Sequence, residues 1–216
     1  MRTVIKTLAV IGLACLSLAA CATAPAPYDY TLFRAEGPNS IVVVPALNNT
    51  AEVTAPDWFL STISQPFANR GYYVFPANMV RGMLNDSGLG DAGLVHHADA
   101  RRLAPLFGCD AVLFIDINKW NAKYLVLKTV VEVDFAYELR SCKTNETLWK
   151  NTQSLQYSPS ASNSGNPIAD LIADAIIAAI QKGRPNYMPL ARQANLAAAA
   201  TPGFGLPDGP YLGPRR

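Results

Sequence analysis

Residues 131–140, VEVDFAYELR, alternate apolar and polar side chains with a period of two over almost their whole length. Successive side chains of a β-strand point to opposite faces of the sheet, so this pattern predicts a half-exposed antiparallel strand. Residues 142–147, CKTNET, predict a turn, and residues 148–157 predict the partner strand of a hairpin. The predicted buried side chains are Val131, Val133, Phe135, Tyr137 and Leu139, and the predicted exposed ones are Glu132, Asp134, Glu138 and Arg140.

The first part of the chain after residue 40 predicts a β-α-β unit. Residues 41–44, IVVV, are a continuous β-branched run ended by Pro45, which is typical of a strand buried on both faces. Helical spacing follows, and it predicts a helix over residues 56–71. A short strand is then predicted over residues 72–75.

Further helices and strands complete the predicted domain. A helix over residues 98–107 ends at Gly108 and leads into a strand over residues 111–118. Residues 167–183, PIADLIADAIIAAIQKG, carry an apolar stripe at helical spacing, which either packs on the sheet or contacts a partner protein or a second copy of this chain. The candidate partner face consists of Ile168, Leu171, Ile172, Ile176, Ile177 and Ile180. The order of elements predicts a single α/β domain over residues 40–183, with a mixed β-sheet flanked by helices.

The first twenty residues have the layout of a secretory signal peptide, with two basic residues, an apolar run over residues 8–18 and small residues before Cys21. The run is too short for a transmembrane helix, which takes about 20 apolar residues. The motif LAAC, residues 18–21, resembles the lipobox of bacterial lipoproteins, in which the cysteine is acylated and becomes the mature N-terminus. The alternative is an ordinary signal peptide with an incidental cysteine. The resemblance implies lipid attachment at Cys21, and Ala22 in place of an aspartate implies the outer membrane, with the protein periplasmic or surface-exposed.

Composition separates two further segments from the domain. Residues 21–39 begin with the proline-rich stretch CATAPAPYDYT, which predicts an extended lipidated tether. Residues 184–216 allow one more helix and end in a Pro/Gly-rich stretch, which predicts an appended or disordered tail. Removal of residues 1–20 takes away two of the 18 basic residues and leaves 16 against 16 acidic ones. A neutral chain lacks the basic surface of nucleic-acid binders, so no nucleic acid is expected as a partner.

Two cysteines besides Cys21 remain in the exported chain. An oxidising compartment permits a disulfide between Cys109 and Cys142, and the alternative is two buried thiols. If the strands flanking residues 121–124 pair as a tight hairpin, Cys109 falls opposite about Ala136, several residues short of Cys142. A bulge, a longer loop or another strand order would bring the two cysteines together.

Signals for catalysis or metal binding are weak. His96 and His97 are adjacent in a predicted loop with no clear third ligand, so neither a metal site nor a cofactor is expected. The sequence contains no G-x-S-x-G elbow and no phosphate-binding glycine loop, so the chain is not expected to be an enzyme. The carboxylates Asp110, Asp116 and Asp134 lie in or beside strands, where we interpret them as structural.

Two motifs resemble known envelope proteins. Residues 106–120, LFGCDAVLFIDINKW, and residues 135–149, FAYELRSCKTNETLW, resemble the α/β domain found in the N-terminal domain of TolB and in the soluble domain of the lipoprotein CsgG. Together with the lipobox and the VVVP strand, they resemble a small family of Gram-negative surface-exposed lipoproteins of unknown function, of the meningococcal vaccine-antigen type. The resemblance implies a TolB N-terminal-like fold and a non-enzymatic accessory component of an envelope secretion or transport assembly. Its implied partners are the membrane, through the N-terminal lipid, and envelope proteins, with a CsgG-like protein first among them. The alternative is a lipoprotein regulator of peptidoglycan synthesis.

Overall fold

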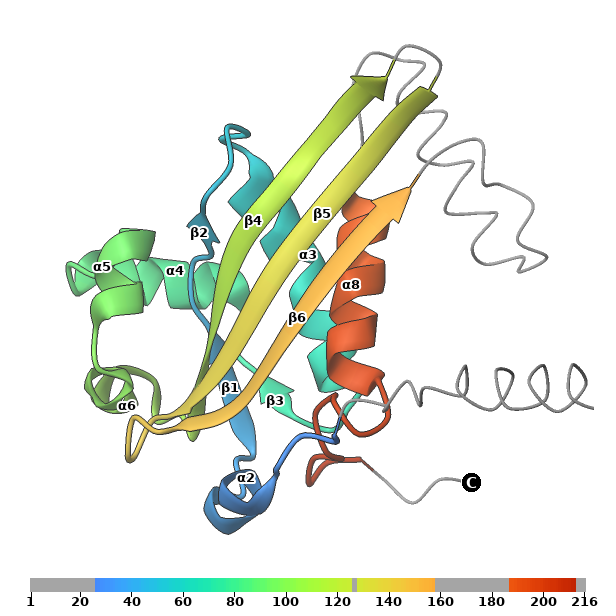
Figure 1. Ribbon diagram of the computed structural model, residues 1–216. Coiled ribbons are helices and arrows are strands. Elements are labelled where there is room, and N and C mark those ends of the chain that lie inside the picture. The colour runs from blue at the N-terminus through green and yellow to red at the C-terminus, as the bar shows by residue number, and fades with distance from the viewer. Residues whose placement is uncertain (1–25, 126–127, 158–186, 213–216) are drawn as a thin grey trace, which may run out of the picture.

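A six-stranded mixed sheet forms the centre of the computed structural model, which confirms the predicted fold class (Figure 1). The structure describes residues 26–125, 128–157 and 187–212. The strands in order along the sheet are β3, β1, β4, β5 and β6, and β2 pairs with β4 outside this path. β1 lies parallel to β3 and β4, whereas β5 lies antiparallel to both of its neighbours, β4 and β6. The strands span Ser40–Val43 (β1), Leu47–Asn48 (β2), Tyr73–Val74 (β3), Ala111–Leu125 (β4), Lys128–Ser141 (β5) and Thr147–Tyr157 (β6).

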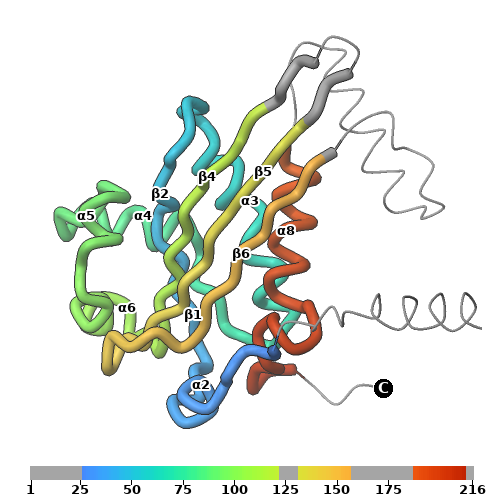
Figure 2. Tube along the Cα trace, in the orientation of Figure 1, coloured from blue at the N-terminus to red at the C-terminus, as the bar shows by residue number. Residues whose placement is uncertain are grey.

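Helices cover the two faces of the sheet unequally. Helices α3 (Ala55–Ala68) and α8 (Met188–Ala200) pack against each other behind β4, β5 and β6 in the view of Figures 1 and 2. On the other face, the helices lie toward the β1 side of the sheet (Figure 1). They are α4 (Ala77–Asp86), α5 (Ala92–His97), the 3₁₀ turn η1 (Ala100–Arg102) and α6 (Ala104–Phe107). Helix α2 (Thr31–Glu36) lies at the end of the molecule where β1 begins (Figure 1).

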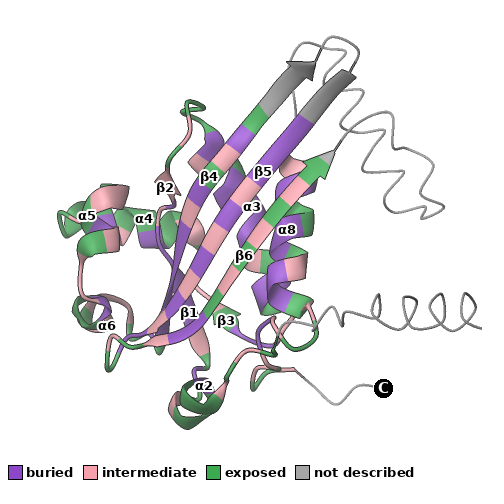
Figure 3. Cartoon of the chain, viewed as in Figure 1, coloured by how far each residue is buried: buried purple, intermediate pink, exposed green. Residues whose placement is uncertain are grey.

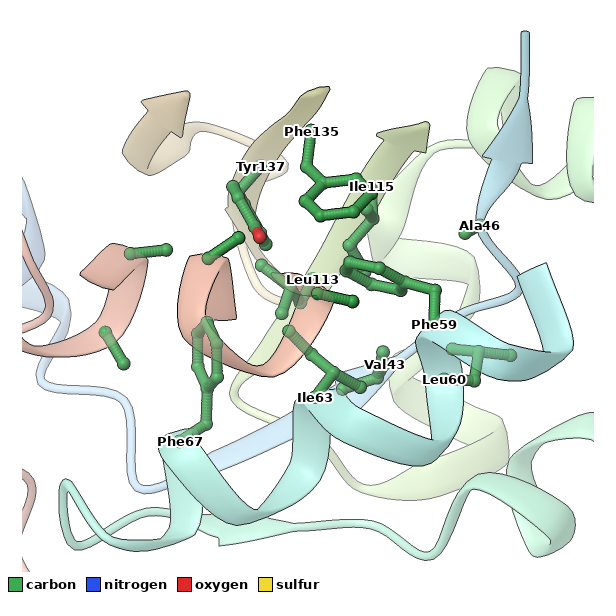
Figure 4. Packing of buried hydrophobic residues seen from close by; sticks show 14 of the residues in the cluster. Val43, Ala46, Phe59, Leu60, Ile63, Phe67, Leu113, Ile115, Phe135 and Tyr137 are labelled. Carbon is green, nitrogen blue, oxygen red and sulfur yellow. The ribbon is translucent and has the colours of Figure 1, made fainter. Parts of the chain in front are cut away.

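Two hydrophobic clusters lie on opposite sides of β1, as the continuous apolar run of that segment predicts. Ile41 and Val43 belong to the cluster under α3 and α8, and Val42 and Val44 belong to the cluster under α4 and α5. Figure 4 shows the larger cluster, in which side chains at helical spacing on α3 face strands β1, β4 and β5. Those of α3 are Phe59, Ile63 and Phe67, and all three are fully buried. Full burial of each such side chain stabilises the fold by about 1.5–3 kcal/mol, so this helix face fixes α3 on the sheet.

The predicted alternation of β5 is confirmed on its apolar face. Val131, Val133, Phe135, Tyr137 and Leu139 are all buried in the larger cluster. The opposite face is less exposed than predicted, because Glu132 is 6% exposed and Asp134, Glu138 and Arg140 are half-buried.

The C-terminal segment is an integral part of the domain. The additional helix predicted within residues 184–216 is confirmed as α8, whereas the prediction of an appended or disordered tail does not hold for residues 187–212. Helix α8 buries Leu190 and Ala194 against α3 and the sheet, and Leu206 beyond it is 2% exposed. The Pro/Gly-rich stretch packs because side chains of the domain bind its backbone: Arg70 donates to the Leu206 carbonyl, and the Tyr72 hydroxyl donates to the Pro207 carbonyl over 2.8 Å.

The predicted tether over residues 21–39 is too long. Residues from Tyr28 onward belong to the domain, since Tyr28 and Tyr30 pack against the larger cluster and Phe33 is 4% exposed. Three aromatic side chains within six residues give this segment apolar surface that packs on the domain, although the prolines before it predict an extended tether. The domain therefore begins about twelve residues earlier than predicted.

Two other element boundaries differ from prediction. Residues 98–107 form η1 and α6 rather than one helix, and His96 and His97 end helix α5 rather than lying in a loop. Asp91 and Asp99 cap the starts of α5 and η1, because Asp91 accepts from the Leu94 N–H and Asp99 from the Arg101 N–H, both over 2.9 Å. Strand β4 also continues past residue 118 to Leu125, through an irregularity between Ile117 and Lys119.

Several predictions lie outside the described residues. These are the signal peptide over residues 1–20, lipid attachment at Cys21 and the helix over residues 167–183 with its apolar face. Within the part of the chain that the structure describes, no helix combines the length and hydrophobicity needed to cross a membrane.

Candidate functional site

The described helices leave much of the polar side of the three long strands open (Figure 1). We define the polar sheet face as Asp116 on β4, Asp134, Glu138 and Arg140 on β5, and Lys150 and Thr152 on β6. Cross-strand pairing places them on one side, because Asp116 pairs with Ala136, Ala136 with Thr152, and Glu138 with Lys150. β6 is half-buried to exposed over most of its described length (Figure 3).

Glu138 is the centre of a hydrogen-bond network on this face. Its carboxylate accepts from Arg140 Nη2 over 2.6 Å and from Thr147 Oγ1 over 2.6 Å, and it lies 3.2 Å from Lys150 Nζ. Burial alone would raise the pKa of Glu138, but the hydrogen bonds from Arg140, Thr147 and Lys150 outweigh burial and lower it to about 2. Glu138 is therefore ionised at neutral pH and holds both cations in place.

Arg140 also contacts the apolar neighbours of this network. Its guanidinium lies 4.6 Å from the ring centroid of Phe114, which is a cation–π distance. The contact fixes the plane of the guanidinium between β4 and β5.

His96 connects helix α5 to the polar sheet face. Its imidazole is 10% exposed, with Nε2 3.0 Å from the Pro45 carbonyl and Nδ1 3.3 Å from Asp116 Oδ1. A carbonyl only accepts, so Nε2 carries the proton and Nδ1 of the neutral ring faces the carboxylate with its lone pair. Burial lowers the pKa of His96 against the opposing effects of Pro45 and Asp116.

These groups line a cleft of about 220 Å³ between α5 and the strands. Its charged residues are Asp116, Glu138, Arg140 and Lys150, two of each sign, and His96 of α5 also lines it. The cleft has the donors, acceptors and aromatic edge of a polar recognition surface. Among the residues that the structure describes, no group of three His, Cys, Asp or Glu side chains could hold a metal ion.

Cys109 and Cys142 lie together at the base of β4 and β5. Their Sγ atoms are 2.13 Å apart and their Cα atoms 6.1 Å apart, as in a disulfide. The tight hairpin that would place Cys109 opposite Ala136 does not form, because β4 and β5 continue to Leu125 and Lys128, and this longer pair of strands brings Ala111 opposite Ser141. Both cysteines are buried in the smaller cluster, where the bond joins the start of β4 to the chain beyond β5.

The three candidate carboxylates contact different groups and do not form one site. Asp110 accepts from the Asn39 N–H, the Ser40 N–H and the Ser40 hydroxyl over 2.9–3.0 Å, so it joins β1 to β4. Asp134 accepts from Asn118 Nδ2 over 3.1 Å, and Asp116 faces His96. His97 is exposed and does not join His96 in a shared site.

Sequence reasoning missed the Glu138 network and the pairing of His96 with Asp116. The first had a signal, because Glu138 and Arg140 share a face at i, i+2 and Lys150 lies on the predicted partner strand. The contact of His96 with Asp116 had no signal in the sequence, because it joins a helix end to a strand twenty residues later.

Comparisons with known proteins identify relatives over most of the chain. The family model described as "Putative lipoprotein GNA1162-like" matches residues 28–207. The "Putative lipoprotein NMB1124/NMB1162" of Neisseria meningitidis serogroup B is 35% identical over 158 residues, which are 72% of this chain and 74% of that protein. The crystal structure of lipoprotein GNA1162 from Neisseria meningitidis is similar with a TM-score of 0.56 and 30% identity, over 67% of this chain and 99% of that one. The PelC dodecamer from Paraburkholderia phytofirmans has a TM-score of 0.40 at 19% identity, over 72% of this chain and 89% of that one.

Proposed function

Because this chain belongs to the GNA1162-like lipoprotein family, we propose that it is a lipid-anchored, non-enzymatic envelope component that acts by binding another envelope protein. The family description supports lipid anchoring, and the lipobox supplies the acylation site at Cys21. The outer membrane is the proposed location, since Ala22 takes the position at which an aspartate would favour retention at the inner membrane.

The observation that carries this proposal is the paired state of the polar sheet face. Glu138 holds Arg140 and Lys150, so the charges at the centre of this face already have partners within the protein. Catalysis needs a nucleophile or an acid–base pair directed at a substrate, whereas a fixed pattern of paired charges suits recognition of a complementary surface. The partly exposed strands β5 and β6 give a partner access to this pattern.

The proposed partner is a protein of an envelope secretion or transport assembly. A CsgG-like protein is the first candidate, and this choice rests on the resemblance of residues 106–120 and 135–149 alone. Binding through the polar sheet face does not depend on which envelope protein is the partner.

Crosslinking in living cells tests the proposal. A photoreactive amino acid at Thr152, exposed on the polar sheet face, is compared with the same amino acid at Leu196, 46% exposed on α8 behind the sheet. We expect an envelope protein crosslinked from Thr152 and absent from Leu196. Identical products at both positions, or only monomer at Thr152, would contradict recognition through this face. A penicillin-binding synthase among the products would favour the alternative role in peptidoglycan synthesis.

Charge reversal supplies a second readout. Lys150→Glu places a second carboxylate beside Glu138, so we expect loss of the Thr152 crosslink without loss of the anchored protein from the membrane fraction. The control is Arg192→Glu on the exposed side of α8, which makes the same reversal from a positive to a negative charge away from the polar sheet face.

A further inference from the structure

We propose that the end of the domain where the tether enters docks on the bilayer that holds the lipid anchor, with a zwitterionic phospholipid headgroup as its ligand. This anchor pole consists of residues 26–36 and 201–212. The proposal rests on the proposed acylation of Cys21, and it adds an orientation and a lipid contact to it.

The two segments of the anchor pole are joined by hydrogen bonds. The Tyr28 N–H donates to the Gly203 carbonyl over 2.8 Å, and the Tyr30 hydroxyl donates to the Gly205 carbonyl over 2.5 Å. Figure 2 shows the start of the described chain beside the segment that follows α8. The point where the tether enters is therefore fixed on the domain surface.

The tether is too short to hold this pole far from the bilayer. The described chain starts at Ala26, which is five residues after Cys21. Five fully extended residues span at most about 18 Å, which is less than two helix diameters of about 10–12 Å each. An acylated Cys21 lies in the bilayer surface, so the anchor pole stays within this distance of the headgroups.

An open pocket of about 350 Å³ lies at the anchor pole and contains a cation suited to a phosphate. Two arginines line it, but Arg70 already donates to the Leu206 carbonyl and pairs with Asp208 over 2.7 Å. Arg34 lies 5.6 Å from the ring centroid of Tyr30 and makes no salt bridge with the residues that the structure describes. Its guanidinium is available for the bidentate contact that phosphate oxygens accept.

The other charges at this pole favour a zwitterionic headgroup over an anionic one. Asp29 is exposed beside Tyr30, and its Oδ1 accepts from the Thr31 N–H and hydroxyl. Carboxylates outnumber arginines here, because Asp29, Glu36 and Asp208 accompany Arg34 and Arg70. A phosphate on Arg34 and an ammonium near Asp29 match both signs of charge, whereas a purely anionic surface would meet this excess of carboxylates.

An exposed tyrosine and an exposed leucine at the anchor pole suit the same environment. Tyr211 is 68% exposed and Leu32 is 36% exposed. Tyrosine is enriched where a membrane meets water, because its ring is apolar and its hydroxyl remains hydrated. Docking would place both side chains at the depth of the headgroups.

The opposite end of the sheet offers a matched control position. Ile41 of β1 pairs with Ala111, whereas Asn48 of β2 pairs with Ile117, six residues further along β4. At about 3.3 Å per residue, this places the loop after β2 roughly 20 Å further from the anchor pole. Val53 in that loop is 85% exposed.

Fluorescence quenching by lipids tests the proposed orientation in the full lipidated protein. Cys21 is acylated and Cys109 is bonded to Cys142, so an introduced cysteine is the single reactive thiol of the mature chain. An environment-sensitive dye is placed by Tyr211→Cys or by Val53→Cys, in vesicles of phosphatidylcholine that contain phosphatidylcholine with a shallow doxyl quencher. We expect quenching at position 211 and none at position 53. Equal quenching at both positions, or stronger quenching at position 53, would overturn the proposal.

Flotation of the vesicles separates this inference from the anchoring on which it rests. A protein that floats without quenching at position 211 is anchored but not docked, and a protein that does not float lacks the anchor. Arg34→Gln is expected to reduce quenching at position 211 toward the value at position 53, while Arg34→Lys retains part of it and neither variant alters thermal unfolding. Quenching that appears only in vesicles of phosphatidylglycerol would overturn the choice of a zwitterionic headgroup.

Discussion

The buried side chain of Asn195 allows a quantitative test of how the C-terminal helix joins the core. Its Oδ1 accepts from the Tyr137 hydroxyl over 2.7 Å, and its Nδ2 donates to Thr62 Oγ1 over 2.9 Å. Asn195 is fully buried, so these bonds join α8 to β5 and to α3 with no competing water. We predict that Asn195→Ala destabilises the whole domain rather than only the C-terminal segment.

The expected magnitude follows from the groups that the substitution leaves behind. The buried Tyr137 hydroxyl loses its acceptor, which costs about 1–3 kcal/mol, and the lost bond to Thr62 costs about 1 kcal/mol. Alanine offsets up to about 0.7 kcal/mol of this loss through its higher helix propensity. The free energy of unfolding should therefore fall by about 1–3 kcal/mol, measured by urea denaturation with tryptophan fluorescence. Gln193→Ala, an exposed amide on the same helix, should change it by less than about 0.5 kcal/mol.

A double-mutant cycle identifies the cause of the loss. Tyr137→Phe removes the hydroxyl, so it should cost less in the Asn195→Ala background than in the parent protein, with a coupling of at least about 1 kcal/mol. If the two losses add within about 0.5 kcal/mol, the hydrogen bond does not carry the effect. An Asn195→Ala protein as stable as its parent would refute the integral packing of α8.

Three further predictions concern titration and oxidation. Denaturation without reductant should show no free thiol at Cys109 or Cys142, and reduction should lower the free energy of unfolding by up to about 4 kcal/mol, from the loop of sequence separation 33 that the bond closes. The pKa of Glu138 is lowered to about 2, so its contribution to stability is present above its ordinary value of 4.5 and is lost as the pH falls toward 2. Urea denaturation across this range should show a steeper decline for the parent than for Glu138→Gln. The pKa of His96 is lowered by burial, so the unfolded chain binds that proton first, and stability should fall as the pH drops below 6.5 and through the folded-state value. Denaturation of His96→Gln should lack this decline, and an unchanged pH profile would contradict a buried neutral imidazole.

Local sequence patterns were sufficient for the elements whose side chains repeat with a clear period. The alternation over residues 131–140 and the β-branched run over residues 41–44 predicted β5 and β1 with their buried faces. The helix predicted over residues 56–71 is α3, because its apolar side chains return at helical spacing. These signals arise within one element, so a single sequence contains them.

Contacts between distant segments explain what the patterns missed. Arg70 binds the Leu206 carbonyl across 136 residues. Every residue has a backbone carbonyl, so the sequence does not indicate which one accepts this hydrogen bond. The hairpin register also depends on how far the two strands extend, and the continuation of β4 to Leu125 brings Cys109 to Cys142 rather than to Ala136. The same limit applies to the cleft, where His96 and Asp116 meet only after α5 has packed against β4.

The two proposed surfaces constrain each other through the direction of the strands. β4 begins at Ala111, beside the end of the domain that carries the anchor pole, and runs away from it toward Leu125 (Figure 1). If the anchor pole faces the bilayer, the strands point away from the membrane and the polar sheet face is directed sideways. A partner then reaches the polar sheet face by moving along the membrane surface. A partner held in the same membrane would meet this face at a raised effective concentration, whereas a freely diffusing protein would not gain that advantage. The short tether therefore favours a membrane-attached partner over a soluble one, for a reason independent of any contact that the partner makes.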